Sequence, residues 1–241
     1  MIKYIDTIIA NFAEFIWGTP LLILLLGGGI FFTLYSKFIP FQYIRHGFDI
    51  LIGKYDNPDD PGQISHFQAL TSALSATIGL GNIAGVAIAV TLGGPGAVFW
   101  MIFIAFFSMS AKFVSCTLGQ LYRKINDDGS VSGGPMYYLQ YGLAEINEDG
   151  WILNKKFYPS LGKILGSIYA VFIIGGAFGG GNMFQANQSY ELFGKLTGIP
   201  NYAYGILLAV LVGIVIIGGI KRIAQTTEKI VPTMVVIYVM A

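Results

Sequence analysis

Long apolar segments, separated by short stretches that hold most of the charges, constrain this chain more than any other feature. Each approaches or exceeds the roughly 18 to 20 residues that a helix needs to cross a bilayer core of about 30 Å. Hydrophobic residues make up 54% of the 241 positions and charged residues 11%, whereas globular domains carry about 25% charged residues. The alternating pattern of membrane barrel strands is absent, so the sequence predicts an all-α, polytopic bundle of transmembrane helices.

The apolar segments also give approximate bounds for the predicted membrane spans. These are residues 16–35, 64–91, 97–121, 162–189 and 202–220, with a sixth span that begins near Ile230. That last apolar run holds 12 residues, Ile230–Ala241, which is short for a crossing. We therefore interpret residues 1–241 as a single transmembrane domain fragment and expect further helices in the intact molecule.

The distribution of lysine and arginine predicts the orientation of these spans in a plasma membrane. Eleven basic residues fall on one side: Lys37, Arg45, Lys54, Arg123, Lys124, Lys155, Lys156, Lys163, Lys221, Arg222 and Lys229. Only Lys3 and Lys195 fall on the other. The positive-inside rule then places the N-terminus outside, the loops 36–63 and 122–161 in the cytoplasm, and the turns 92–96 and 190–201 outside.

Net charge and cysteine content exclude several classes of function. A formal net charge of +1 gives no reason to expect a nucleic-acid partner. The single cysteine, Cys116, excludes an intrachain disulfide and any multi-cysteine metal site. The partner that this composition does imply is the lipid bilayer.

The second predicted span contains residues that weaken a helix at membrane depth. Gly79, Gly81, Asn82 and Gly85 lie near its middle, and each glycine costs roughly 1 kcal/mol against alanine in a helix interior. Backbone freed at that depth is tolerated where it lines a cavity. A half-helix that begins near Asn82 would point free N–H groups, and the positive end of its dipole, at a substrate carboxylate.

The other half of this span, which ends near Thr77 to Gly79, would present free carbonyl oxygens. The side-chain oxygens of Thr77 and Asn82 add to them, so both residues are candidate sodium ligands. Because residues 61–126 contain no aspartate or glutamate, these two spans cannot build a carboxylate proton relay. The alternative is that small residues simply allow close helix packing.

Two further patterns each have a plainer interpretation beside the functional one. Gly79, Gly81 and Ala84 match a dinucleotide-binding fingerprint, but that fingerprint requires a preceding strand and a later acidic residue, and residues 86–126 contain none. Lys112 shares a helix face with Ser108 and Ser115. Its ammonium either snorkels towards the interface or bonds to carbonyls of the broken helix.

The fourth predicted span carries polar side chains at helical spacing. The positions on this face are Gly175, Phe178, Asn182, Gln185 and Ser189, because residues three or four apart share one side of a helix. Asn182 and Gln185 would either bond to neighbouring helices or line a substrate path.

Four motifs occur in order: GQISHFQALTSALSATIGLGNIAGVAIAVTLGGPGAVFWM (62–101), SAKF (110–113), SGGPMYYLQ (132–140) and GGGNMFQANQ (179–188). In these motifs the chain resembles the alanine or glycine:cation symporter family. The resemblance implies a LeuT-like fold of the amino-acid, polyamine and organocation type, with two inverted five-helix repeats preceded by one extra helix. Residues 16–35 would be that extra helix, and residues from about 64 to 241 the first repeat with its last helix truncated.

The resemblance also implies where substrate and ion bind. It places the carboxylate and amine of the substrate near Thr77, Gly79, Gly81 and Asn82, with Asn182 and Gln185 flanking, and sodium nearby. Two residues depart from the family pattern: Leu80 stands where threonine is common, and Ser115 where glutamate is expected.

These observations predict a secondary active transporter, not an enzyme. We expect sodium-coupled symport of alanine, glycine or a similar small amino acid by alternating access, with Na+ as the coupling ion and no organic cofactor. The alternatives are a passive channel or a non-transporting membrane sensor on the same helices. An intramembrane enzyme would need catalytic residues that this sequence does not contain.

Overall fold

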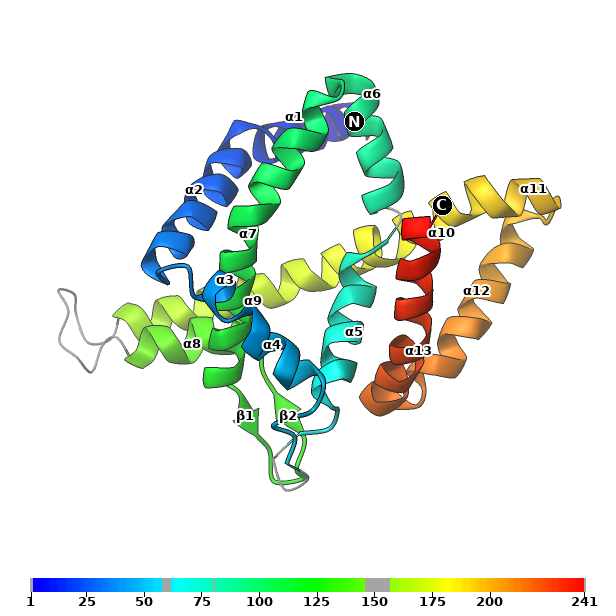
Figure 1. The fold of residues 1–241 in the computed structure, drawn as a ribbon. Helices are drawn as coiled ribbons and strands as arrows, with labels where there is room; N and C mark the ends of the chain where they lie inside the picture. The colour runs from blue at the N-terminus through cyan, green and yellow to red at the C-terminus, as the bar shows by residue number, and fades with distance from the viewer. Residues whose placement is uncertain (1, 58–61, 80, 146–156, 241) are drawn as a thin grey trace.

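The computed structural model of the protein describes residues 2–57, 62–79, 81–145 and 157–240. Helices dominate it (Figure 1). The first part comprises α1 (Ile2–Trp17), α2 (Thr19–Tyr35), α3 (Ile39–Gln42), α4 (Ile44–Leu51), α5 (His66–Thr77), the π-helix η1 (Gly81–Gly85), α6 (Val86–Gly93) and α7 (Gly96–Leu121). The second comprises β1 (Lys124–Ile125), β2 (Val131–Ser132), α8 (Pro135–Glu145), α9 (Phe157–Gly176), η2 (Ala177–Met183), α10 (Phe184–Ser189), η3 (Tyr190–Gly194), α11 (Lys195–Thr197), α12 (Asn201–Ile216) and α13 (Gly219–Met240).

The helices are those of a multi-pass membrane protein. By length and composition, three described helical segments can cross a membrane unaided: Asp6–Tyr35, Gly96–Leu121 and Tyr158–Thr197. Two further helix pairs qualify only when taken together, because each is bent: His66–Thr77 with Gly81–Gly93 by 53°, and Asn201–Ile216 with Gly219–Met240 by 113°. The predicted spans 16–35 and 97–121 therefore have helical counterparts, and the predicted span 64–91 is a broken helix.

The accessible surface of the chain is larger and more apolar than that of a water-soluble protein of this size. It amounts to 17937 Å², whereas a globular monomer of 26.1 kDa would expose roughly 10,600 Å². Among the described residues, Tyr204, Ala224 and Val231 form the whole set of buried apolar side chains. Large side chains such as Phe172 and Ile237 are exposed, so lipid or further protein must cover them.

Two close helix contacts depend on glycines. A Cβ atom placed on Gly29 of α2 would lie 3.0 Å from Cβ of Phe107 on α7. On α9, a Cβ at Gly162 would lie 2.6 Å from the carbonyl oxygen of Leu139, and one at Gly166 would lie 2.9 Å from that of Met136, both on α8. Gly162 and Gly166 are spaced as in small-xxx-small packing motifs, and here they allow the α8 backbone to approach α9 directly.

Two predicted loops are helical instead. The predicted outer turn 190–201 continues the helix to Thr197, which Gly198 ends at a φ of 68°. An ion pair between Glu191 and Lys195, four residues apart, supports helix in this polar stretch. The stretch between the predicted fifth and sixth spans also belongs to one helix, α13, which begins at Gly219; the fifth span ends at Ile216 and not at residue 220.

The predicted loops 36–63 and 122–161 contain regular structure. The first holds α3 and α4, and the second holds α8, the start of α9 and a two-stranded antiparallel sheet in which Lys124 pairs with Ser132. Beside this small ribbon the described chain is mostly helical, as predicted. The sequence DDGS supplies the turn, because Gly129 adopts a φ of +76° and Asp128 Oδ1 accepts hydrogen bonds from the Ser130 N–H and hydroxyl.

Candidate functional site

The predicted helix break lies between Thr77 and Gly81. Helix α5 ends at Thr77, and Ile78 turns away with an extended backbone (φ −93°, ψ 105°). The N–H of Ile78 donates the last hydrogen bond to the carbonyl of Leu74, at 2.7 Å. In the described part of the chain, no backbone N–H donates to the carbonyl of Ser75 or Thr77. The break is confirmed, and within the described residues the Ser75 and Thr77 carbonyl oxygens at the end of α5 accept no backbone hydrogen bond, as a cation site requires.

Thr77 keeps the capacity to bind a cation. Its hydroxyl donates to the carbonyls of Ala73 and Leu74, at 3.0 and 3.2 Å. A hydroxyl that donates its only hydrogen still has lone pairs with which to coordinate an ion. The Thr77 side chain is exposed at the end of α5, so its oxygen is accessible from the break.

The second half of the broken helix begins as a π-helical turn, which the sequence did not predict. Gly81 and Asn82 lie in η1, and both are exposed. The N–H of Asn82 donates to the carbonyl of Gly79 at 3.0 Å. One N–H expected to face a substrate is therefore already bonded, which leaves the Asn82 side-chain amide and the neighbouring N–H groups for a ligand. Single π-helical turns occur often at functional sites.

The fourth predicted span also contains a π-helical segment, at Ala177–Met183. Asn182 lies in it and is exposed, and its side chain makes no hydrogen bond within the described residues. The predicted common face assumed α-helical spacing throughout, and that spacing is not kept where the helix widens to i→i+5 bonding. Ser189, predicted to lie on the same face, forms a hydrogen bond with the Tyr204 hydroxyl at 2.5 Å.

Gly79 and Gln185 bring the two segments together. A Cβ atom on Gly79 would lie 3.3 Å from both Nε2 and Oε1 of Gln185, a half-buried residue of α10. Gln185 Nε2 also donates to the Gly180 carbonyl at 3.5 Å. In Figure 1 the α10 label lies beside the gap between α5 and α6. An amide that can donate and accept thus lies directly against the break.

Polar side chains attach α5 to α13. Gln68 Nε2 donates to Glu228 Oε2 at 2.8 Å, and the Ser72 and Thr227 hydroxyls lie 3.1 Å apart. Gln68 also completes the capping box at the start of α5, because its Oε1 accepts from the N–H of Ser65. One glutamine therefore fixes both the N-terminus of the broken helix and its contact with α13.

Replacing Glu228 with alanine should destabilise the protein by about 1.5 to 3 kcal/mol, because it leaves a half-buried donor on Gln68 without its charged acceptor. Thermal unfolding of the purified protein measures this. Glu228→Gln, which keeps an acceptor oxygen, should cost less. Glu191→Ala is the matched control, since an exposed pair with Lys195 is worth about 0 to 1 kcal/mol. Equal effects of Glu228→Ala and Glu191→Ala would show that the contact with Gln68 contributes nothing.

Other predicted positions lie away from the break. Lys112 is exposed on α7, and its ammonium group forms no hydrogen bond or ion pair within the described residues. It therefore does not bind carbonyls of the broken helix. Ser115 lies 3.5 Å from the Tyr138 hydroxyl. Leu80 lies outside the described residues. No group of three or more His, Cys, Asp or Glu side chains in the described ranges could hold a metal ion, so an ion at the break would depend on neutral oxygens.

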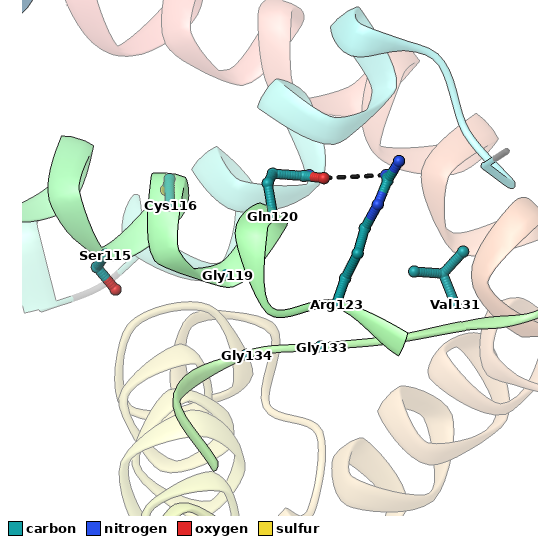
Figure 2. A pocket seen from close by; sticks show the side chains of 8 residues that line it. All are labelled: Ser115, Cys116, Gly119, Gln120, Arg123, Val131, Gly133 and Gly134. Atoms are coloured by element: carbon teal, nitrogen blue, oxygen red, sulfur yellow. Dashed lines mark hydrogen bonds between the residues drawn. The ribbon is translucent and has the colours of Figure 1, made fainter. Parts of the chain in front are cut away.

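A hollow of the described chain lies elsewhere. It has a volume of about 400 Å³ and lies between the end of α7 and the segment after β2 (Figure 2). None of the six predicted substrate residues lines it. At the break, Thr77, Gly81 and Asn82 are exposed.

Comparison with known proteins gives consistent results. Residues 2–241 match the profile described as "Sodium:alanine symporter family". The chain is 43% identical over 228 residues to a sodium/alanine symporter, AgcS, of Methanococcus maripaludis, covering 95% of this chain and 48% of that protein. It is 34% identical over 242 residues to a probable sodium/glutamine symporter, GlnT, of Bacillus subtilis, covering 99% and 46%. The chain thus spans about half the length of the curated relatives it matches.

Proposed function

Because the chain belongs to the sodium:alanine symporter family, we propose that it forms part of a secondary active transporter that couples sodium entry to uptake of alanine, glycine or a similar small amino acid. The single observation that carries this proposal is the helix break at Thr77–Gly81 with the Gln185 amide against Gly79. Broken helices at membrane depth are where sodium-coupled transporters bind substrate and ion.

The two ends of the break suit the two charges of an amino acid. The N-terminal turn at Gly81–Gly85 offers backbone N–H groups and the Asn82 amide to the carboxylate. The carbonyl oxygens at the end of α5 and the amides of Asn182 and Gln185 can accept from the ammonium group. Sodium would bind Thr77 Oγ1, Asn82 Oδ1 and free carbonyls, where the substrate carboxylate adds the negative charge that the neutral oxygens lack.

We further infer the architecture from the same resemblance. Residues 16–35 would be the extra helix that precedes a LeuT-like fold, and residues from about 64 to 241 the first inverted repeat, present here without its partner. A second repeat would enclose the break and complete the substrate site. Alternating access would then move the two repeats relative to each other around the bound amino acid.

Uptake by the complete protein in proteoliposomes tests the coupling. With an inward sodium gradient, alanine should accumulate above its external concentration, and sodium and alanine should each tighten the binding of the other by about 5- to 150-fold. Glycine and glutamine, tested in parallel, define the substrate. Equally fast uptake without sodium would contradict the coupling. Uptake that stops at equal concentrations would favour a passive channel, and binding without uptake a sensor.

A further inference from the structure

Two adjacent cations follow the end of a membrane-crossing helix. Helix α7 ends at Leu121, and Arg123 and Lys124 follow it after one residue, Tyr122. Together with Tyr122 and Tyr141 they line a cavity of about 390 Å³. Arg123 also borders the neighbouring cavity, where Figure 2 shows its side chain between Gln120 and Val131. One guanidinium thus stands at the boundary of both cavities.

No carboxylate forms an ion pair with these two cations in the described part of the chain. Arg123 Nη1 donates to the amide oxygen of Gln120 at 3.0 Å, and no hydrogen bond or ion pair of the Lys124 ammonium is found there. Two nearby carboxylates accept hydrogen bonds from hydroxyl groups: Glu145 from Tyr122 at 2.5 Å, and Asp128 from Ser130. Both cations are exposed, and neither forms an ion pair among the described residues.

The walls of the cavity are aromatic and held in place. The hydrogen bond to Glu145, with some desolvation, raises the pKa of Tyr122, so its phenol stays protonated and adds no negative charge. Helix α8 packs on the ring, because a Cβ on Gly142 would lie 3.2 Å from Tyr122 Cζ. Gly133 packs closely against α7, because a Cβ atom placed on Gly133 would lie 3.2 Å from the carbonyl oxygen of Gly119.

We propose that Arg123 and Lys124 bind the phosphate of an anionic phospholipid. A guanidinium binds phosphate oxygens through paired N–H donors, and a neighbouring ammonium adds a second charge. A lipid is favoured over a soluble phosphate because the cations lie at the end of the spanning helix Gly96–Leu121, where phospholipid headgroups lie and tyrosines are enriched. The site does not depend on the proposed transport function.

Lipid retention by the complete purified protein tests the site. After reconstitution with equal phosphatidylglycerol and phosphatidylcholine and extensive detergent washing, wild-type protein should retain phosphatidylglycerol preferentially. Each neutralising change, Arg123→Gln or Lys124→Gln, should weaken this preference about fivefold, and the double variant should abolish it. Lys163→Gln is the control, because Lys163 is an exposed cation near the start of α9 that lines neither cavity.

Two further measurements distinguish a bound lipid from a soluble phosphate and from misfolding of the variants. The charge-preserving pair Arg123→Lys with Lys124→Arg should retain the lipid even if neutral variants fold poorly. Glycerol phosphate in solution should not displace the lipid at concentrations comparable to it; equal competition would assign the site to a soluble phosphate and overturn the proposal. Equal retention of both lipids by wild type, or the same loss in Lys163→Gln as in the double variant, would also overturn it.

Discussion

Replacing Gly79 with valine is expected to reduce sodium-driven alanine uptake by the complete protein at least about 100-fold, or about 2.8 kcal/mol. The reason is the position of Gln185, whose amide nitrogen and oxygen both lie 3.3 Å from where the first side-chain carbon would stand. A branched side chain there must displace that amide from the break. Gly79 does not adopt a positive φ, so the loss reports side-chain volume and not backbone strain.

Smaller changes at the same contact should give graded effects. Gly79→Ala requires the flexible end of Gln185 to move by only a few tenths of an ångström and should retain most uptake. Gln185→Ala should reduce uptake as much as Gly79→Val. The double variant should reduce it little further, because each single change already removes the Gln185 amide from its position against the break. Gly213→Val is the volume control, since the described neighbourhood of Gly213 holds nothing within 4 Å. Additive losses in the double variant would show that Gly79 and Gln185 act separately.

The helix break could be predicted because its cause is local. Gly79, Gly81 and Asn82 each disfavour an α-helix, and they interrupt an apolar segment long enough to cross a membrane. Three of the membrane spans, Asp6–Tyr35, Gly96–Leu121 and Tyr158–Thr197, could be predicted from hydrophobic length. The orientation of the chain in the membrane and the residue roles in substrate binding stay predictions, because they depend on groups outside these residues.

The π-helical turns could not be predicted. A shift from i→i+4 to i→i+5 bonding has no residue signature of its own, and only the glycines of GNIAG and AFGGGNM indicated unusual backbone at η1 and η2. The shared face from Gly175 to Ser189 assumes regular α-helical spacing and stays a prediction.

Helix α13 was missed in part because hydropathy cannot detect a polar helix in a membrane protein. Its segment KRIAQTTEK is polar, and Thr227 and Glu228 from it contact Ser72 and Gln68 on α5. Protein contacts, not lipid, satisfy these side chains. The same limit applies to Glu191 and Lys195, which form an ion pair within a helix that was predicted to be a turn.

Replacing Gly162 with alanine is expected to destabilise the protein by about 1 to 3 kcal/mol, and Gly162→Leu by more. The added carbon would stand 2.6 Å from the carbonyl oxygen of Leu139. This neighbour belongs to the α8 backbone, so no side-chain rotation can relieve the clash and the two helices must separate. Gly166→Ala, at 2.9 Å from the Met136 carbonyl, should have a similar but smaller effect. Thermal unfolding of the purified protein measures each.

The control is a second glycine of the same helix, at which alanine is not expected to lower the stability of the protein. Gly175 of α9 has nothing described within 4 Å, so Gly175→Ala should leave stability unchanged or raise it by up to about 1 kcal/mol, because alanine is the better helix former. Intrinsic propensity favours alanine equally at both positions. A loss at Gly162 together with no loss at Gly175 therefore isolates the α8–α9 contact, whereas stabilisation at both positions would show that α8 does not pack as closely on α9 as these distances require.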